Sequence, residues 1–188
     1  MTKVSSTKIV EQVDVEPTTH QLRLPDADSV AEIALAEALE FCAKKVGLVG
    51  RQAVVEHLRQ GDSNACKYCH YSLAKQVAES IGTLDENVKA IYVADYDATP
   101  EDLCFGETAK PSPIHLIAWV ERKTSALGSL VEALNRALVQ RYADMIGPSQ
   151  LAYLLDIQAV DDADVKNRVG YGALLSSLRN RPIKIWER

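Results

Sequence analysis

A run of cysteine and histidine is the first feature of this chain that could do chemistry. It reads Cys66-Lys67-Tyr68-Cys69-His70. Two thiols and an imidazole can attach haem, bind zinc or exchange electrons. Offsets of three and four residues also place these side chains on one face of a helix. The run therefore has a haem, a zinc, a redox and a purely structural interpretation.

The haem and redox interpretations depend on the surroundings of the run. Attachment of c-type haem takes place outside the cytoplasm, and "MTKVSSTKIVEQVDVEP" contains no apolar stretch of the kind found in secretory signals, so we expect no haem. In a redox site, the helix N-terminus would stabilise the thiolate of Cys66. Thioredoxin-like proteins place such a pair after a strand, whereas a helix and a short turn precede it here.

A zinc site would need a fourth ligand besides Cys66, Cys69 and His70. The candidates are His57, from the preceding helix, and Cys104, from a long loop. In tetrahedral geometry, Zn–S bonds of about 2.3 Å would bring the sulfur of Cys104 to about 4 Å from the other two. The zinc interpretation therefore predicts that this loop lies close to the helix.

Core packing is the structural interpretation of the same run. Cys66 and Cys69 share an apolar stripe with Leu73 and Val77, and cysteine behaves as a small, well-buried hydrophobic residue. His70 would then be a polar residue flanking the stripe. We expect core packing first and the zinc site second.

Acidic residues follow two predicted strands and form a second candidate site. Strand 114–121 ends at Glu121, with Lys123 just beyond, and strand 151–160 runs into Asp161, Asp162 and Asp164. A right-handed helical crossover between these strands would make them parallel, so that both groups lie at the carboxyl edge of the sheet. Asp95 and Asp97, after strand 88–94, would join them only if that strand were also parallel.

A strand that ends in E-x-K before a long helix is similar to the core of the PD-(D/E)xK nucleases, here over residues 88–160. The resemblance implies a metal-dependent phosphoester hydrolase with Glu121, Lys123 and Asp161 in its catalytic site and Mg²⁺ as cofactor. Alternatively, the aspartates cap a helix N-terminus, where the helix dipole favours acids. We expect the capping role.

Composition limits the class of protein. The chain has 188 residues, 47% of them hydrophobic and 25% charged, which is typical of one soluble domain or of one domain with a small appendage. The net charge of −5 disfavours nucleic acid as a partner. No apolar run is long enough for a membrane helix. We therefore expect a cytoplasmic protein whose four cysteines are thiols or metal ligands.

Hydrophobic periodicity predicts an α/β protein. An extended arm over 1–24 precedes a helical region over 25–83, and a sheet region over 84–188 shares one domain with the helices. In the sheet region we expect the order strand, strand, helix, strand, helix, strand. This order predicts a mixed or mostly parallel sheet of four strands, with helices on at least one face.

The arm and the candidate sites together suggest two functions. The strand-like pattern of "KIVEQVDVE" predicts that the arm supports a homodimer. The first functional hypothesis is an interaction or regulatory module with a protein partner, which includes a thiol or zinc site at the cysteine run. The second is the metal-dependent hydrolase. His115, in strand 114–121, is expected to be a hydrogen-bonded structural histidine.

Overall fold

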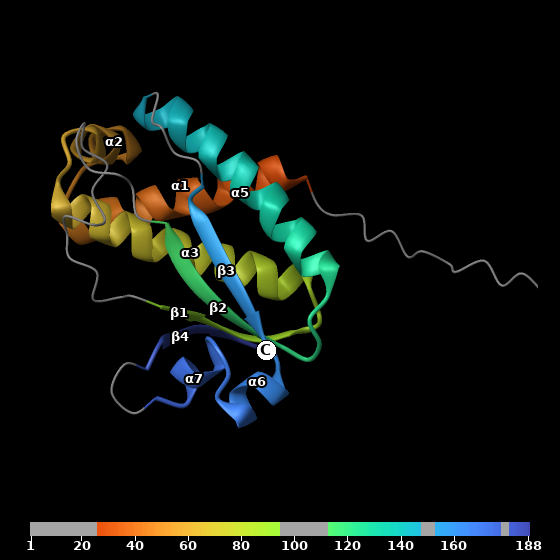
Figure 1. Ribbon diagram of the computed structural model, residues 1–188. Coiled ribbons are helices and arrows are strands. Elements are labelled where there is room, and N and C mark those ends of the chain that lie inside the picture. Colours follow the sequence, from red (N-terminus) through yellow and green to blue (C-terminus); the bar gives the residue numbers. More distant parts are fainter. Residues whose placement is uncertain (1–25, 95–112, 148–152, 178–180) are drawn as a thin grey trace, which may run out of the picture.

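The computed structural model of the protein describes residues 26–94, 113–147, 153–177 and 181–188 (Figure 1). The arm at 1–24, the acids Asp95 and Asp97, and Cys104 lie outside these residues. None of the helices in the described ranges is long and apolar enough to span a membrane.

Three helices open the described chain, α1 (Ala27–Val46), α2 (Arg51–Arg59) and α3 (Ser63–Leu84). Local capping sets the ends of two of them. The carboxylate of Asp26 accepts a hydrogen bond from the Asp28 N–H at the start of α1, and Gly47 ends that helix in the left-handed conformation. The carboxylate of Asp62 accepts from the Ala65 N–H at the start of α3.

Four strands form one sheet in the order β3-β2-β1-β4. They are β1 (Val88–Val93), β2 (Ile114–Val120), β3 (Leu155–Val160) and β4 (Ile183–Glu187). β1 is antiparallel to both β2 and β4, whereas β2 and β3 are parallel. The predicted N-terminal helical region and four-stranded mixed sheet are confirmed, and the sheet is mixed rather than mostly parallel.

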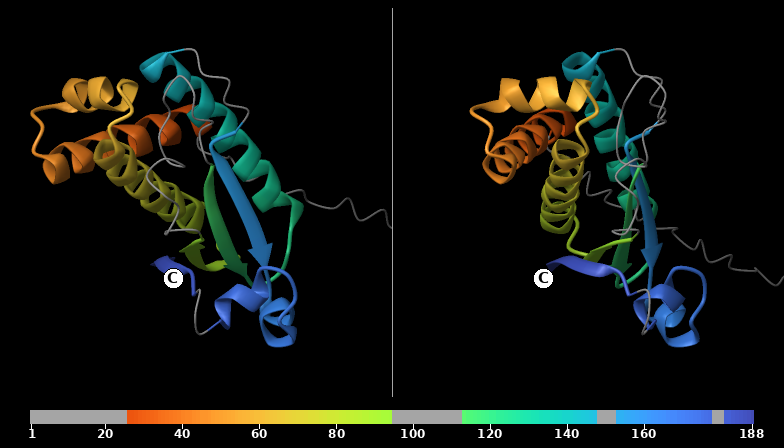
Figure 2. Two further views of the ribbon diagram at one scale, coloured as in Figure 1. Left: turned by 60° about the vertical axis from the view of Figure 1, so that its left-hand side comes forward. Right: turned by 90° about the vertical axis from the view of Figure 1, so that its left-hand side faces the viewer.

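The remaining helices are α5 (Ser125–Ile146), α6 (Asp162–Asn167) and α7 (Gly172–Leu175). Helices α1, α2, α3 and α5 lie on one side of the sheet, and the short pair α6–α7 lies at its far end (Figure 2). Residues of α6 and α7 pack against the face of the sheet that α1, α3 and α5 leave uncovered, where Tyr92, Ile117 and Val160 are buried.

The main core lies between the large helices and the sheet. It includes Leu39 of α1, Val77 of α3 and Leu134 of α5, together with Ile91 and Leu116 of the sheet. Successive side chains of β2 point to opposite faces of the sheet: Leu116 and Ala118 enter the main core, and Ile117 lies on the other face. The helices therefore form a continuous apolar layer with the strands.

Strand β4 holds the end of α3 against the sheet. The guanidinium of Arg188 donates to the carbonyl oxygens of Gly82 (2.7 Å) and Asp85 (3.2 Å). Gly82 lies in the last turn of α3, where helix geometry leaves the carbonyl without a partner inside the helix. The ring of Trp186 covers Gly82 so closely that a Cβ there would lie 2.4 Å from it. Only glycine fits this contact without displacing the tryptophan.

Two details of the sheet, the start of β3 and the direction of β1, depend on contacts between residues distant in the sequence. β3 begins at Leu155 rather than at 151, because the side-chain oxygen of Asn135 accepts hydrogen bonds from the N–H groups of Leu154 and Leu155 (2.8 and 3.0 Å). The apolar run before Leu155 concealed this boundary. The direction of β1 does not follow from its sequence; the strand is antiparallel to β2, so its carboxyl end lies at the opposite end of the sheet from Glu121.

Candidate functional site at the carboxyl edge of the sheet

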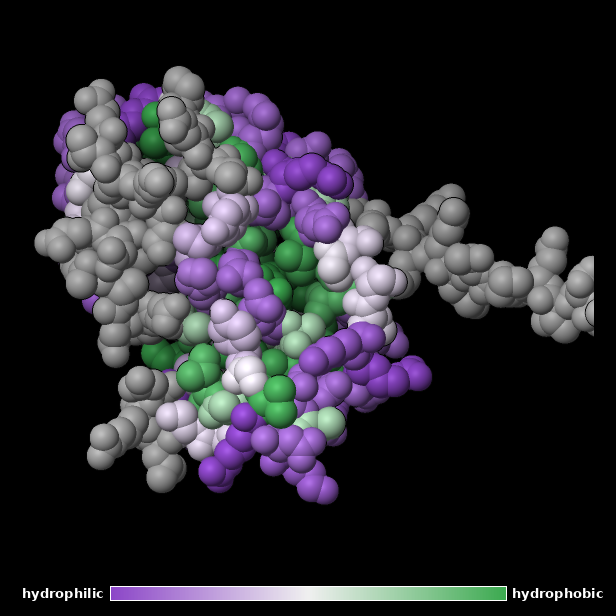
Figure 3. All heavy atoms as spheres, viewed as in Figure 1, coloured by the Kyte–Doolittle hydropathy of each residue, from purple (hydrophilic) through white to green (hydrophobic). Residues whose placement is uncertain are grey.

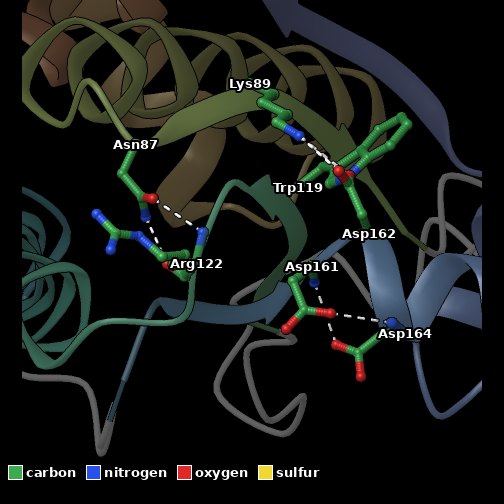
Figure 4. A network of polar contacts seen from close by, with 7 residues as sticks. All are labelled: Asn87, Lys89, Trp119, Arg122, Asp161, Asp162 and Asp164. Carbon is green, nitrogen blue, oxygen red and sulfur yellow. Dashed lines mark hydrogen bonds and ion pairs between the residues drawn. The ribbon is translucent and has the colours of Figure 1, made fainter.

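The carboxyl ends of β2 and β3 meet at one edge of the sheet, as the sequence predicted for parallel strands. Because β1 runs the other way, its first residues also reach this edge. We call the polar side chains gathered there the carboxyl-edge cluster. Its members are Asn87, Lys89, Trp119, Arg122, Lys123, Asp161, Asp162 and Asp164 (Figure 4 shows all but Lys123).

Asp162 is the most connected carboxylate of the cluster. It accepts hydrogen bonds from the ammonium of Lys89 (2.9 and 3.0 Å) and from the indole N–H of Trp119 (2.7 Å). These two donors lower the pKa of the Asp162 carboxyl. The same ammonium lies 5.8 Å from the centre of the Trp119 ring, within cation–π range. Asp162 therefore joins β1, β2 and α6.

Asp161 and Asp164 form a reciprocal capping box at the start of α6. Each side chain accepts a hydrogen bond from the backbone N–H of the other residue, at 2.9 and 3.1 Å. The helix-capping interpretation is thus confirmed for these two aspartates. Lys123 forms an ion pair with Asp164, which lowers the pKa of that carboxyl and raises the pKa of the lysine.

On the other side of the cluster, the side-chain amide of Asn87 bonds to the backbone of Arg122. Asn87 donates from its side chain to the Arg122 carbonyl (2.6 Å) and accepts from the Arg122 N–H (2.9 Å). The backbone N–H of Glu121 donates to the Asn87 carbonyl (2.8 Å). Asn87 thereby prolongs the pairing of β1 with β2 beyond Val120, and the side chain of Glu121 is exposed.

The arrangement of the cluster decides what chemistry it can do. A magnesium site needs carboxylate oxygens that converge and remain available to the ion. Here Asp162 and Asp164 are neutralised by Lys89 and Lys123, and Asp161 is committed to the helix cap. The donor set therefore does not fit a preformed magnesium site.

The cysteine run lies in α3, on the face that enters the main core. Cys66 and Cys69 are 1% and 3% exposed and are buried with Leu73 and Val77, as the packing interpretation predicts. A thiol that exchanges electrons must be accessible, and the side chain of Cys66 is not. Cys42 of α1 belongs to the same core and donates to the Ala65 carbonyl (3.3 Å).

Burial also changes the acidity of these thiols. It raises the pKa of Cys42 to about 11 and raises the pKa of Cys69, where the neighbouring Cys42 and Cys66 add to the effect. Zinc binding and thiol exchange both use the thiolate. The surroundings of Cys69 therefore favour the form that does neither.

Neither histidine that was proposed as a ligand joins the thiols. The Nδ1 of His57 lies 3.4 Å from a carboxylate oxygen of Asp62. The Nδ1 of His70 is buried and has no hydrogen-bond partner among the described residues, and burial lowers the pKa of this imidazole to about 4. Across the described ranges, which do not contain Cys104, no three such side chains are placed to share a metal ion.

Sequence reasoning identified His115 as structural but missed its partner. Its Nδ1 lies 2.9 Å from a carboxylate oxygen of Asp156, directly opposite on β3, and Gln158 donates to the other oxygen (2.7 Å). The expected hydrogen bond of His115 is confirmed. Only the register of the two strands could have revealed the pair, since 41 residues separate its members.

Comparisons of the chain with protein-family models, with curated proteins and with solved structures find no significant match.

Proposed function

We propose that this protein is a self-associating interaction or regulatory module. The observation that carries the proposal is that the two outer strands of the sheet, β3 and β4, each have one side without a neighbouring strand in the described ranges. Within the described ranges, β3 pairs with β2 alone and β4 pairs with β1 alone. The outer backbone groups of such strands can pair with another chain.

Exposed apolar side chains lie beside both edges and support the same proposal. Tyr153, two residues before β3, is 50% exposed, and Ile183, the first residue of β4, is 42% exposed. Val169 and Tyr171 are exposed in the connection between α6 and α7. On the face drawn in Figure 3, hydrophobic side chains gather in the middle of the molecule and near α6 and α7, among hydrophilic ones.

The mass of the protein in solution tests this proposal. Sedimentation velocity over a wide range of protein concentrations should show a concentration-dependent shift from the monomer to the dimer. Association by strand pairing should respond little to salt, because its main contacts are backbone hydrogen bonds and apolar surface. A monomer at every concentration would contradict the proposal.

A metal-dependent phosphoester hydrolase is the second candidate function. The observation in its favour is that β2 and β3 are parallel, so that Glu121, Lys123 and Asp161, which follow these strands, reach the same edge. The test is hydrolysis of a chromogenic phosphodiester with and without Mg²⁺, using Lys123→Ala and the exposed control Lys166→Ala. Equal background rates in all samples would reject it.

A further inference from the structure

We infer that the partner at the outer edge of β3 is a second copy of this chain, paired antiparallel and centred on Ile157. Two four-stranded sheets would thereby form one continuous sheet with a two-fold axis. The inference rests on the proposed self-association and adds the contact surface and its register.

The direction of the backbone groups shows which atoms are available. The Ile114 N–H donates to the Leu154 carbonyl at the start of the β2–β3 pairing (2.7 Å). In a parallel pair, alternate residues direct both backbone groups to the same neighbour. Asp156 and Gln158 therefore bond toward β2, whereas Ile157 and Ala159 direct their N–H and C=O groups away from it.

The two edges of the sheet differ in how well they could accept another strand. The register of β4 with β1 shifts between Ile91 and Tyr92, and β4 carries the exposed Lys184. Bulges and edge lysines are devices that block edge-to-edge association. β3 pairs with β2 in an unbroken register from Leu155 to Val160 and contains neither proline nor lysine. Among the described residues, β3 is thus the outer strand without a bulge or a lysine, and its one outward group already bonded is the Leu155 N–H, which donates to Asn135.

The charge on β3 favours a second copy as the occupant. Asp156 is the only charged side chain of the strand, and it already lies against His115 and Gln158. A pairing centred on Ile157 places Asp156 opposite Gln158 of the other copy. Pairing centred on Asp156 would instead oppose two carboxylates, which is unfavourable. The strand is thus complementary to itself in one register.

The anchor at Asn135 removes one hydrogen bond from each end of this pairing. The N–H of Leu155 donates to Asn135, whereas the carbonyl of Leu155 faces outward and is available to another strand. In the pairing centred on Ile157, that carbonyl lies opposite Ala159 of the other copy and accepts its N–H. The two Ile157 residues exchange both of their hydrogen bonds across the axis.

The experiment removes one outward N–H while leaving the bonds to β2 intact. Ala159→Pro deletes the donor, and Ala159→Gly, which keeps it, is the matched control. Proline is tolerated on an edge strand where its nitrogen faces outward. The dissociation constant of the dimer, from sedimentation velocity, should rise about tenfold or more for Ala159→Pro and change much less for Ala159→Gly.

A charge variant tests the register. Gln158→Asp would oppose Asp156 of the other copy and weaken the dimer, whereas Gln158→Lys should not. A chain that starts at Pro25 should still dimerise. Each variant is first shown to be folded by its thermal transition at low concentration.

The outcomes separate this inference from the proposed function. A wild-type dimer that Ala159→Pro does not weaken overturns the β3 contact and leaves self-association standing. Loss of the dimer in the chain starting at Pro25 also overturns it and assigns the contact to the arm. A wild-type chain that never associates defeats both proposals.

Discussion

The layer around α3 holds cysteines and a histidine in the core, whereas the carboxyl edge of the sheet holds aspartates and lysines near solvent. Along α3, burial keeps Cys69 and His70 neutral. At the edge, Asp162 and Asp164 stay charged because the ammonium groups of Lys89 and Lys123 pair with them and lower the pKa of each carboxyl. The comparison teaches that a chemical motif acts only as its surroundings allow. Desolvation favours the neutral forms in the first region, and ion pairing favours the charged forms in the second.

The largest expected effect belongs to the buried layer. Leu134 of α5 is 1% exposed within the main core, so Leu134→Ala should lower the free energy of unfolding by about 2 to 5 kcal/mol. Denaturant unfolding provides the measurement. The exposed neighbour Glu132→Ala should change it by about 0.5 kcal/mol or less. Equal effects of the two variants would contradict the packing of α5.

The contact of β4 with α3 gives the second prediction. Gly82→Ala would place a Cβ 2.4 Å from the Trp186 ring and should destabilise the protein by about 1 to 3 kcal/mol. Gly128→Ala is the matched control, because that helical glycine has open space and should stabilise the protein slightly. A Gly82→Ala protein as stable as wild type would show that Trp186 does not pack there.

The third prediction concerns the pH dependence of the buried layer. Burial lowers the pKa of His70 from 6.5 to about 4, and the neighbouring His115 adds to this shift. The unfolded chain therefore binds the proton first as the pH falls. The stability associated with neutral His70 should be complete above pH 6.5 and be lost toward pH 4. In His70→Gln, the thermal transition temperature should depend less on pH across this window than in the wild type. The same slope against pH in both proteins would refute the prediction.

The smallest effect is expected at the carboxyl edge. Lys89 and Trp119 lower the pKa of Asp162 below 3.8, so its contribution is present above that pH and is lost as the pH falls through the lowered value. Asp162→Asn should lower the transition temperature less than the substitutions above, because the pair is exposed to solvent. Glu37→Gln, on the exposed face of α1, is the control. A loss as large as that of Leu134→Ala would break the comparison.

The sequence predicted the helices better than the details of the sheet. Helices can be predicted because their signals are local: the apolar residues repeat every three to four positions, and caps such as Asp26 and Asp62 lie next to the helix that they begin. The antiparallel direction of β1 depends on pairing with distant strands, and the start of β3 depends on Asn135. The carboxyl edge was found because parallel strands end together. Lys89 and Trp119 escaped notice because their link to Asp162 spans elements far apart in sequence.

The contacts of Arg188 have a consequence for the order of folding. They join residues 100 to 106 positions apart, whereas α1 and α3 pack across a short connection through α2. Chain entropy makes such distant contacts slow to form, so the docking of β4 should follow the helical layer. Arg188→Ala should then accelerate unfolding and leave the folding rate nearly unchanged in stopped-flow measurements. A slower folding rate would place β4 in the transition state.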